Sequence, residues 1–235
     1  MNLIKYCKEE FNPLFGCKTI QIGTLEYYRE IESNRNIHDP KEGILTFSVI
    51  NYNSKEDVSN RKYFDFIGSN ISLNGCYVEK IIPNCCVFCL SMNDILEGNQ
   101  FDEAYNSSFK IKSLILFINT IVRVLKMNLT RDNFNEFDVQ SIFSEDSFKK
   151  RLEILPFSNP VNYNSSKNQL IKNASEMSYK EIPNELQVLF TKDEKYKNDS
   201  EYRIAFVFRY RNRIISIKKD PIILNIEKYT DLFSN

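Results

Sequence analysis

The stretch EYRIAFVFRYR, residues 201–211, begins where a long polar segment of the chain ends at Ser200. Its apolar run predicts a strand that is buried in the protein. Glu201 therefore lies at the entrance to this strand, and Asp199 precedes it by two residues. Because side chains alternate along an extended chain, we expect Asp199 and Glu201 on the same side of it.

Strand patterns recur along the rest of the chain. Alternation and short apolar runs predict strands at residues 2–7, 18–23, 44–51, 62–68, 76–82, 85–91, 213–219 and 221–226. Asn74-Gly75, between the fourth and fifth of these strands, is typical of a two-residue hairpin turn. We expect the strands to form mostly antiparallel sheets.

The clearest helix is predicted at residues 108–128. Its apolar residues recur at spacings of three and four, as in a helix that packs on a core: Ile111, Leu114, Ile115, Ile118, Ile121, Val122 and Leu125. A short helix is expected at residues 24–32, with Thr24 as its cap. Weaker helical patterns occur at 148–155, 168–177 and 184–196, in a region that Pro156 and Pro160 interrupt. The sequence predicts a single α+β domain over residues 1–235, with a central amphipathic helix and a helical insertion around 108–190.

The overall composition does not suggest a general polyanion-binding protein, because 31 basic and 31 acidic residues give a formal net charge of zero. Local basic patches are compatible with this composition. RYRNR, residues 209–213, is either a nucleic-acid contact or a solvated hairpin tip. The N-terminus lacks the apolar region of a signal peptide, and the apolar segment 114–125 is short and contains Asn119 and Arg123. We therefore expect a cytoplasmic protein without membrane association. The oligomeric state is left open.

The cysteines and the single histidine argue against metal binding. The sequence shows no secretion signal, so the six cysteines are not expected to form disulfides. Cys85, Cys86 and Cys89 lie in an apolar run, where thiols pack as small hydrophobic groups. His38 is the only histidine, and the cysteines show no paired zinc-ligand spacing. We expect no metal site. Phosphate-loop, dinucleotide-binding, serine-hydrolase and zinc-protease motifs are absent from the sequence.

The Asp199–Glu201 pair has two interpretations. Two carboxylates beside the end of a strand can divide roles, with one of them stabilising the positive charge that develops when an N-glycosidic bond to ribose is cleaved. Alternatively, Glu201 forms an ion pair with Arg203 or a lysine at the surface, which contributes little to stability. Arg203 could instead bind a phosphate group with both arms of its guanidinium.

Several segments, in order, resemble the DUF2971 family of bacterial and phage proteins. They are IKYC at 4–7, KTIQIGTLEYYREIE at 18–32 with HDPKEG at 38–43, VFCLS at 87–91 and KYKNDSEYRI at 195–204. The chain departs from the family pattern at Asp199, where Glu is common, and at Ile4, where an aromatic residue often precedes the lysine.

The same order of motifs resembles, more distantly, the ADP-ribosyltransferase superfamily. The resemblance implies an ADP-ribosyltransferase-like fold and NAD as a substrate. It makes Glu201 the catalytic carboxylate, Ser91 a residue that holds the nicotinamide side of NAD, and Asp199 a residue that faces the acceptor. Lys5 or Tyr6 takes the early binding position, and Tyr27 and Tyr28 offer an aromatic face for nicotinamide.

This resemblance implies an enzyme that moves ADP-ribose to a protein or a nucleic acid, or that hydrolyses NAD, in the setting of conflict between phage and host. The alternative is a non-catalytic factor of phage or defence origin that binds a protein or a nucleic acid. A metal-dependent nuclease that uses the acidic residues is a third hypothesis.

Overall fold

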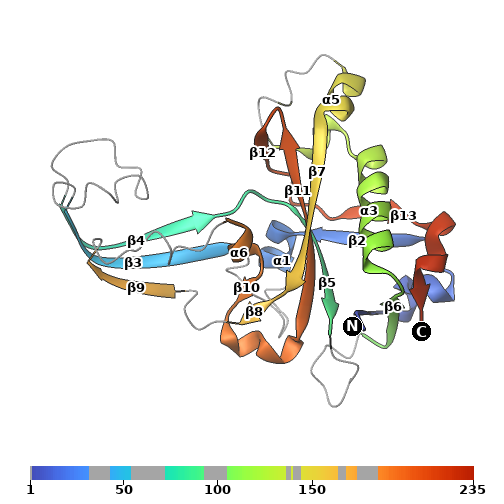
Figure 1. Cartoon of the computed structure of the whole chain (residues 1–235), viewed down its shortest axis with the longest axis horizontal. Coiled ribbons are helices and arrows are strands. Elements are labelled where there is room, and N and C mark those ends of the chain that lie inside the picture. The colour runs from blue at the N-terminus through green and yellow to red at the C-terminus, as the bar shows by residue number, and fades with distance from the viewer. Residues whose placement is uncertain are drawn as a thin grey trace. The chain divides into compact units, whose positions relative to one another are not determined.

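A computed structural model describes residues 2–31, 43–53, 72–92, 105–135, 139, 144–163, 168–173 and 185–235 (Figure 1). The chain forms two compact units. Unit 1 comprises Met1–Glu42, Pro83–Val161 and Tyr196–Asn235, and unit 2 comprises Gly43–Ile82 and Asn162–Lys195. The single domain expected over residues 1–235 stays a prediction, and each unit is described by itself.

Unit 1 is built on a nine-stranded sheet in which all strand pairs are antiparallel. Its centre is β11 (Glu201–Tyr210), the strand predicted from the stretch at 201–211. β7 (Leu152–Pro160) pairs along one edge of β11, whereas β5 (Cys86–Ser91) and β12 (Arg213–Ile215) pair along the other. The sheet continues through β1 (Ile4–Cys7), β6 (Ser107–Ile111) and β14 (Phe233–Ser234), while β2 (Thr19–Thr24) joins β5 to β13 (Ile222–Asn225). The predicted α+β class with mostly antiparallel strands is thus confirmed.

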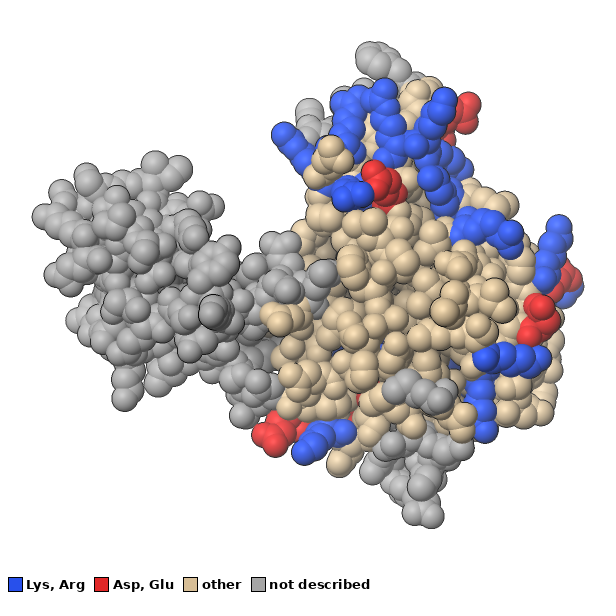
Figure 2. Space-filling model, in the orientation of Figure 1, with Lys and Arg blue, Asp and Glu red and all other residues tan. Residues whose placement is uncertain are grey.

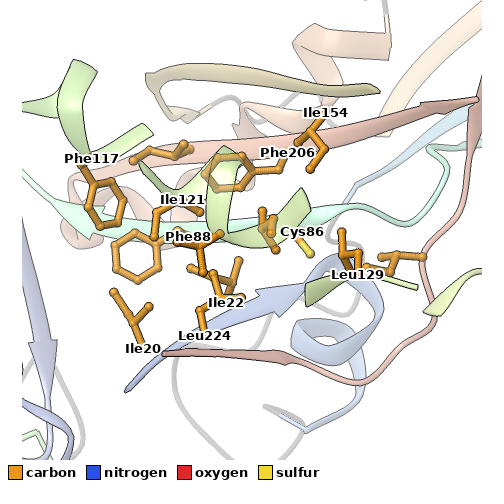
Figure 3. Close-up of a cluster of buried hydrophobic side chains, with 14 of the residues drawn as sticks. Ile20, Ile22, Cys86, Phe88, Phe117, Ile121, Leu129, Ile154, Phe206 and Leu224 are labelled. Atoms are coloured by element: carbon orange, nitrogen blue, oxygen red, sulfur yellow. The ribbon is translucent and has the colours of Figure 1, made fainter. Parts of the chain in front are cut away.

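Alternation along the strands gives the sheet of unit 1 two different faces. Tyr202, Ile204, Phe206 and Phe208 of β11 point into the main hydrophobic core, together with Cys86, Phe88 and Leu90 of β5. Figure 3 shows Phe88, Phe206, Ile20 and Ile22 in one cluster with Phe117 and Ile121. We call this side of the sheet the core face.

The helix α3 (Leu114–Asn128) packs on the core face, and the centres of the Phe117 and Phe88 rings lie 5.2 Å apart. It begins later than predicted, because residues 107–111 form β6 and Ser113 caps the helix by accepting the Leu116 N–H. The buried residues of α3 are Phe117, Ile121, Val124 and Leu125, whereas Ile115, which we expected in the core stripe, is 73% exposed.

The predicted helical insertion is less helical than expected. α5 (Glu145–Arg151) ends at the C-cap Leu152, and the chain then continues as β7, which pairs with β11 from Tyr210↔Leu152 to Tyr202↔Pro160. The sequence did not predict this strand, because Pro156 and Pro160 usually indicate a break in regular structure. Proline lacks a backbone N–H, but it fits an edge strand, and β7 pairs on one side only within the described chain.

Unit 2 contains a three-stranded sheet of β4 (Ser72–Ile81), β3 (Ile44–Asn53) and β9 (Asn168–Asn173), with β3–β4 antiparallel and β3–β9 parallel. Asn74-Gly75 lies inside β4, where Asn74 pairs with Asn51, so the hairpin prediction there is wrong. The predicted strand at 62–68 lies outside the described residues. Residues 168–173, predicted as helix, form β9, and the helix predicted at 184–196 is reduced to α6 (Glu185–Leu189) before β10 (Thr191–Lys192), which pairs with β8 (Asn162–Tyr163).

Short 3₁₀ helices complete the described chain: η1 (Glu9–Phe11), η2 (Pro13–Phe15), η5 (Arg131–Asn133), η8 (Glu194–Asp199) and η9 (Glu227–Leu232). Among the helices of the described residues, none has the length and apolar character needed to cross a membrane.

Candidate functional site

Three neighbouring strands of unit 1 align Glu201, Ser91 and Ile4 in one row. Glu201 is the register partner of Ser91 between β11 and β5, and Ser91 is the register partner of Ile4 between β5 and β1. Partners in an antiparallel pair lie about 4.5–5.5 Å apart at Cα and point to the same side of the sheet. The side chains of Glu201 and Ser91 therefore emerge next to each other.

These side chains lie on the side of the sheet opposite to the core face. Tyr202 and Leu90, the adjacent residues, belong to the main core, so alternation directs Glu201 and Ser91 away from it. Arg203 and Tyr6 lie on the same side by the same alternation. We call this side, which carries Tyr6, Ser91, Glu201 and Arg203, the site face.

Lys5 lies on the core face and is thereby separated from the other residues predicted for the site. Its Nζ donates a hydrogen bond to the backbone oxygen of Cys89 at 3.0 Å and lies 5.0 Å from the centre of the Phe88 ring. Of the two alternatives for the early binding position, Tyr6 shares the site face with Glu201 and Lys5 does not.

Glu201 and Arg203 form a buried ion pair. Arg203 Nε donates to Glu201 Oε1 at 2.8 Å, and the two side chains are 1% and 6% exposed. The alternative interpretation predicted an ion pair between Glu201 and Arg203, but at the exposed surface; the pair is formed and is buried. In a buried site the attraction between the charges is screened much less, whereas removal of one partner leaves a charge that water cannot reach. The pair therefore fixes the position of the Glu201 carboxylate.

Asp199 is not placed by strand alternation, so the expectation that it lies on the same side of an extended chain as Glu201 is wrong. Asp199 ends η8, and Ser200 has a φ of 43°, which is the left-handed region and turns the chain before β11 begins. The Met92 N–H binds the Ser200 oxygen at 2.9 Å, and Ser91 Oγ lies 3.5 Å from the backbone oxygen of Asp199. Asp199 thus contacts Ser91 through its backbone, and one carboxylate oxygen, Oδ2, is buried.

The helix α1 (Leu25–Ile31) covers part of the site face. Thr24 caps it as predicted, because Thr24 Oγ1 accepts the Tyr27 N–H at 3.1 Å. Gly23 of β2 pairs with Val87 of β5, which alternation places on the site face. The Tyr28 ring occupies the space that a side chain at Gly23 would need, with a ring carbon 2.5 Å from the Cβ position.

Tyr27 is held beside Tyr28. Its hydroxyl accepts a hydrogen bond from Gln21 Nε2 at 3.2 Å, and the two rings meet edge to face with their centres 5.6 Å apart. Both tyrosines are half-buried. The predicted pair of aromatic residues therefore lies together on the same side of the sheet as Glu201.

Arg29 is a candidate that the sequence pattern did not single out. It follows Leu25 by one helical turn and thus lies on the side of α1 that carries this fully buried residue. Its Nε and Nη2 atoms are buried, and among the described residues they have no hydrogen-bond partner. Two buried guanidinium nitrogens without an acceptor among the described residues suit an anionic ligand, but in the sequence Arg29 is one of many charged residues.

The thiols of Cys7 and Cys86 are poorly suited to metal binding or nucleophilic attack. Burial raises the pKa of Cys7 to about 11, although nearby Lys5 opposes the shift, and burial raises the pKa of Cys86 well above its ordinary value. A neutral thiol is a poor ligand and a poor nucleophile. Within the described residues no group of His, Cys, Asp and Glu could hold a metal ion, and His38 lies outside them.

The arrangement can do one kind of chemistry well. A carboxylate fixed by a guanidinium lies beside a hydroxyl on the site face, and α1, which covers part of this face, adds aromatic rings and the Arg29 guanidinium. Such a carboxylate can stabilise a positive charge that develops on a substrate held against that face. Comparison of the chain with models of protein families, with curated proteins and with solved structures gave no match.

Proposed function

We propose that the protein is an NAD-consuming enzyme similar to ADP-ribosyltransferases, with Glu201 as its catalytic carboxylate. One observation carries this proposal: the strand register places Glu201 opposite Ser91, on a face that also carries Tyr6 and Tyr28. The order of motifs that resembles this superfamily thus corresponds to residues that share one side of a sheet.

In the proposed reaction the bond between the nicotinamide nitrogen and C1′ of the ribose breaks. Its electron pair stays on nicotinamide, which leaves as a neutral molecule, and positive charge develops on the ribose ring. The Glu201 carboxylate stabilises this charge, and Arg203 keeps the carboxylate in place. A nucleophile of the acceptor, or water, then bonds to C1′ and loses its proton.

The other residues bind NAD in this proposal. Ser91 donates a hydrogen bond to the nicotinamide side, and the rings of Tyr6 and Tyr28 provide flat surfaces for it. Arg29 supplies the cation for the pyrophosphate, because two of its buried nitrogen atoms have no acceptor among the described residues. Lys5 has no part, since it is engaged on the core face.

The second candidate is a non-catalytic factor that binds a protein or a nucleic acid. The burial of both Glu201 and Arg203 favours it, because a buried, paired carboxylate can be a structural element of β11. The two candidates differ in what the site does with NAD.

Titration of the full chain with NAD in a calorimeter tests the proposal, with wild type and Glu201→Gln side by side. Glutamine keeps the shape of the side chain and an oxygen for Arg203. We expect both proteins to bind NAD with similar affinity, because the carboxylate acts mainly on the charge of the transition state. Absence of heat with NAD and with ADP-ribose in both proteins would refute the proposal and favour the binding factor.

A further inference from the structure

Two basic segments that are 60 residues apart in the sequence meet at one end of unit 1. Lys150 and Arg151 are the last residues of α5, Arg211 lies in the turn between β11 and β12, and Arg213 begins β12. Figure 2 shows Lys and Arg side chains gathered at the end of unit 1 where Figure 1 places α5 and β12.

The register of the sheet brings these segments together. Leu152, next to Arg151, pairs with Tyr210, next to Arg211. The rings of Phe148 and Tyr210 also stack with their centres 5.7 Å apart, which holds α5 against β11. The approach of the two segments therefore rests on backbone pairing and on side-chain packing.

The C-terminal end of α3 joins the same surface. Lys149 Nζ donates to the backbone oxygen of Met127 at 2.9 Å, and Lys126 precedes Met127 in the last turn of α3. We name the combined surface the basic end. It consists of Lys126, Lys150, Arg151, Arg211 and Arg213, all of which are exposed.

Four of the five basic side chains of the basic end form no salt bridge with the described residues. Two nearby acidic residues form salt bridges with arginines outside the basic end: Glu153 pairs with Arg209, and Glu145 pairs with Arg131. In the part of the chain that the structure describes, Lys126, Lys150, Arg151 and Arg211 make no salt bridge. A chain of zero net charge thus concentrates cations at one place.

The turn between β11 and β12 carries its arginine at a conformational cost. Arg211 and Asn212 have φ values of 49° and 64°, the conformation of a type I′ hairpin, which glycine, asparagine and aspartate favour. A side chain with Cβ costs about 1–2 kcal/mol in this region relative to its ordinary conformation. A residue that opposes its local conformation suggests a role outside folding.

We propose that the basic end binds the phosphate backbone of a nucleic acid. Guanidinium groups match phosphate oxygens in geometry and charge, and exposed lysines add electrostatic attraction. This binding is independent of the NAD chemistry proposed above.

Other macromolecules fit the basic end less well. Protein interfaces have an apolar centre and few lysines, whereas Met127 and Ile214 are the large apolar side chains exposed beside these cations. A membrane surface favours exposed aromatic residues that enter the lipid, but Phe148 and Tyr210 are buried.

Fluorescence anisotropy of the full chain with a labelled oligonucleotide of about 25 nucleotides tests the proposal, as DNA and as RNA, single-stranded and duplex. We expect binding that weakens as salt rises from about 50 to about 200 mM. The variant Arg211→Gly with Lys150→Ala should bind at least about tenfold more weakly, and the slope of log affinity against log salt should fall by about two. Glycine suits the turn at position 211, so this variant should fold as well as wild type.

The matched control is Lys112→Ala with Lys228→Ala, which removes the same charge. Lys112 precedes the N-terminal end of α3, about 20 Å from Lys126 by the rise of the helix, and Lys228 lies in η9. The control should keep wild-type affinity and slope. Equal losses in both variants, no binding to any oligonucleotide, or binding to phosphatidylserine vesicles alone would overturn the proposal.

Discussion

Arg203 Nε lies 2.8 Å from Oε1 of Glu201, and both residues belong to β11, two positions apart. Strand alternation alone brings them to the same side, and both side chains of the pair are buried. This pair makes the site face of β11 polar in the same strand whose other face fills the hydrophobic core.

Arg203→Met should destabilise the protein by about 3–5 kcal/mol, because it removes the guanidinium that pairs with the buried Glu201 carboxylate. The double variant Glu201→Gln with Arg203→Met should recover most of this loss, since it removes both charges of the pair. Urea denaturation followed by circular dichroism measures both free energies of unfolding. If Arg203→Met alone costs less than about 1 kcal/mol, as exposed pairs do, the pair is not buried in solution.

Replacing Lys5 should not change the affinity of the protein for NAD. Lys5→Met removes the hydrogen bond to Cys89 and the contact with Phe88, both on the core face, so we expect some loss of stability and an unchanged Kd for NAD. Tyr6→Ala should weaken NAD binding about tenfold, which corresponds to about 1.4 kcal/mol. Calorimetry on folded variants compares them, and the opposite ranking would show that the early binding position is Lys5.

Arg29→Met should separate binding from stability. Among the described residues the variant loses no hydrogen bond from Nε or Nη2, so the free energy of unfolding should stay constant or rise by up to about 1 kcal/mol. The affinity for NAD should fall about tenfold, because the pyrophosphate loses its cation. A variant that is clearly destabilised but binds NAD normally would assign Arg29 a structural role.

Cys7 should make stability depend on alkaline pH. Burial raises the pKa of its thiol from the ordinary value of 9.0, which holds in the unfolded chain, to about 11 in the folded protein. Between these values the unfolded chain has lost its proton while the folded protein keeps it, so stability falls as pH rises from about 9 to about 11. Chemical denaturation of wild type and Cys7→Ala across this range measures the effect. The difference in stability between the two proteins should be constant below pH 9 and should decrease above it; a constant difference throughout would contradict the shift.

The central strand, its neighbour at 85–91 and the first strand could be predicted from their apolar runs, and so could the Thr24 cap. β7 could not, because Pro156 and Pro160 suggest breaks and because its edge position depends on β11, which lies 40 residues further along the chain. The start of α3 was misplaced because Ile111 continues the helical spacing of Leu114 and Ile118 although it belongs to β6.

Several residues of the candidate site could be predicted from the sequence, but their positions relative to one another could not. Alternation suggested that Asp199 and Glu201 share one side, but the left-handed conformation of Ser200 turns the chain between them. The register of β1 with β5 decides whether Lys5 or Tyr6 shares a face with Glu201, and the basic end depends on the register of β7 with β11. Such pairings between distant segments have no signal in a single sequence.

Release of nicotinamide from NAD, measured by chromatography, tests the central claim most directly. Wild type and Glu201→Gln are compared at matched folded concentration, with water, a mixed protein fraction and DNA as acceptors. The account predicts release by wild type with at least one acceptor and a rate at least about 100-fold lower for Glu201→Gln. Equal rates in the two proteins, or no release by wild type with any acceptor, would contradict it.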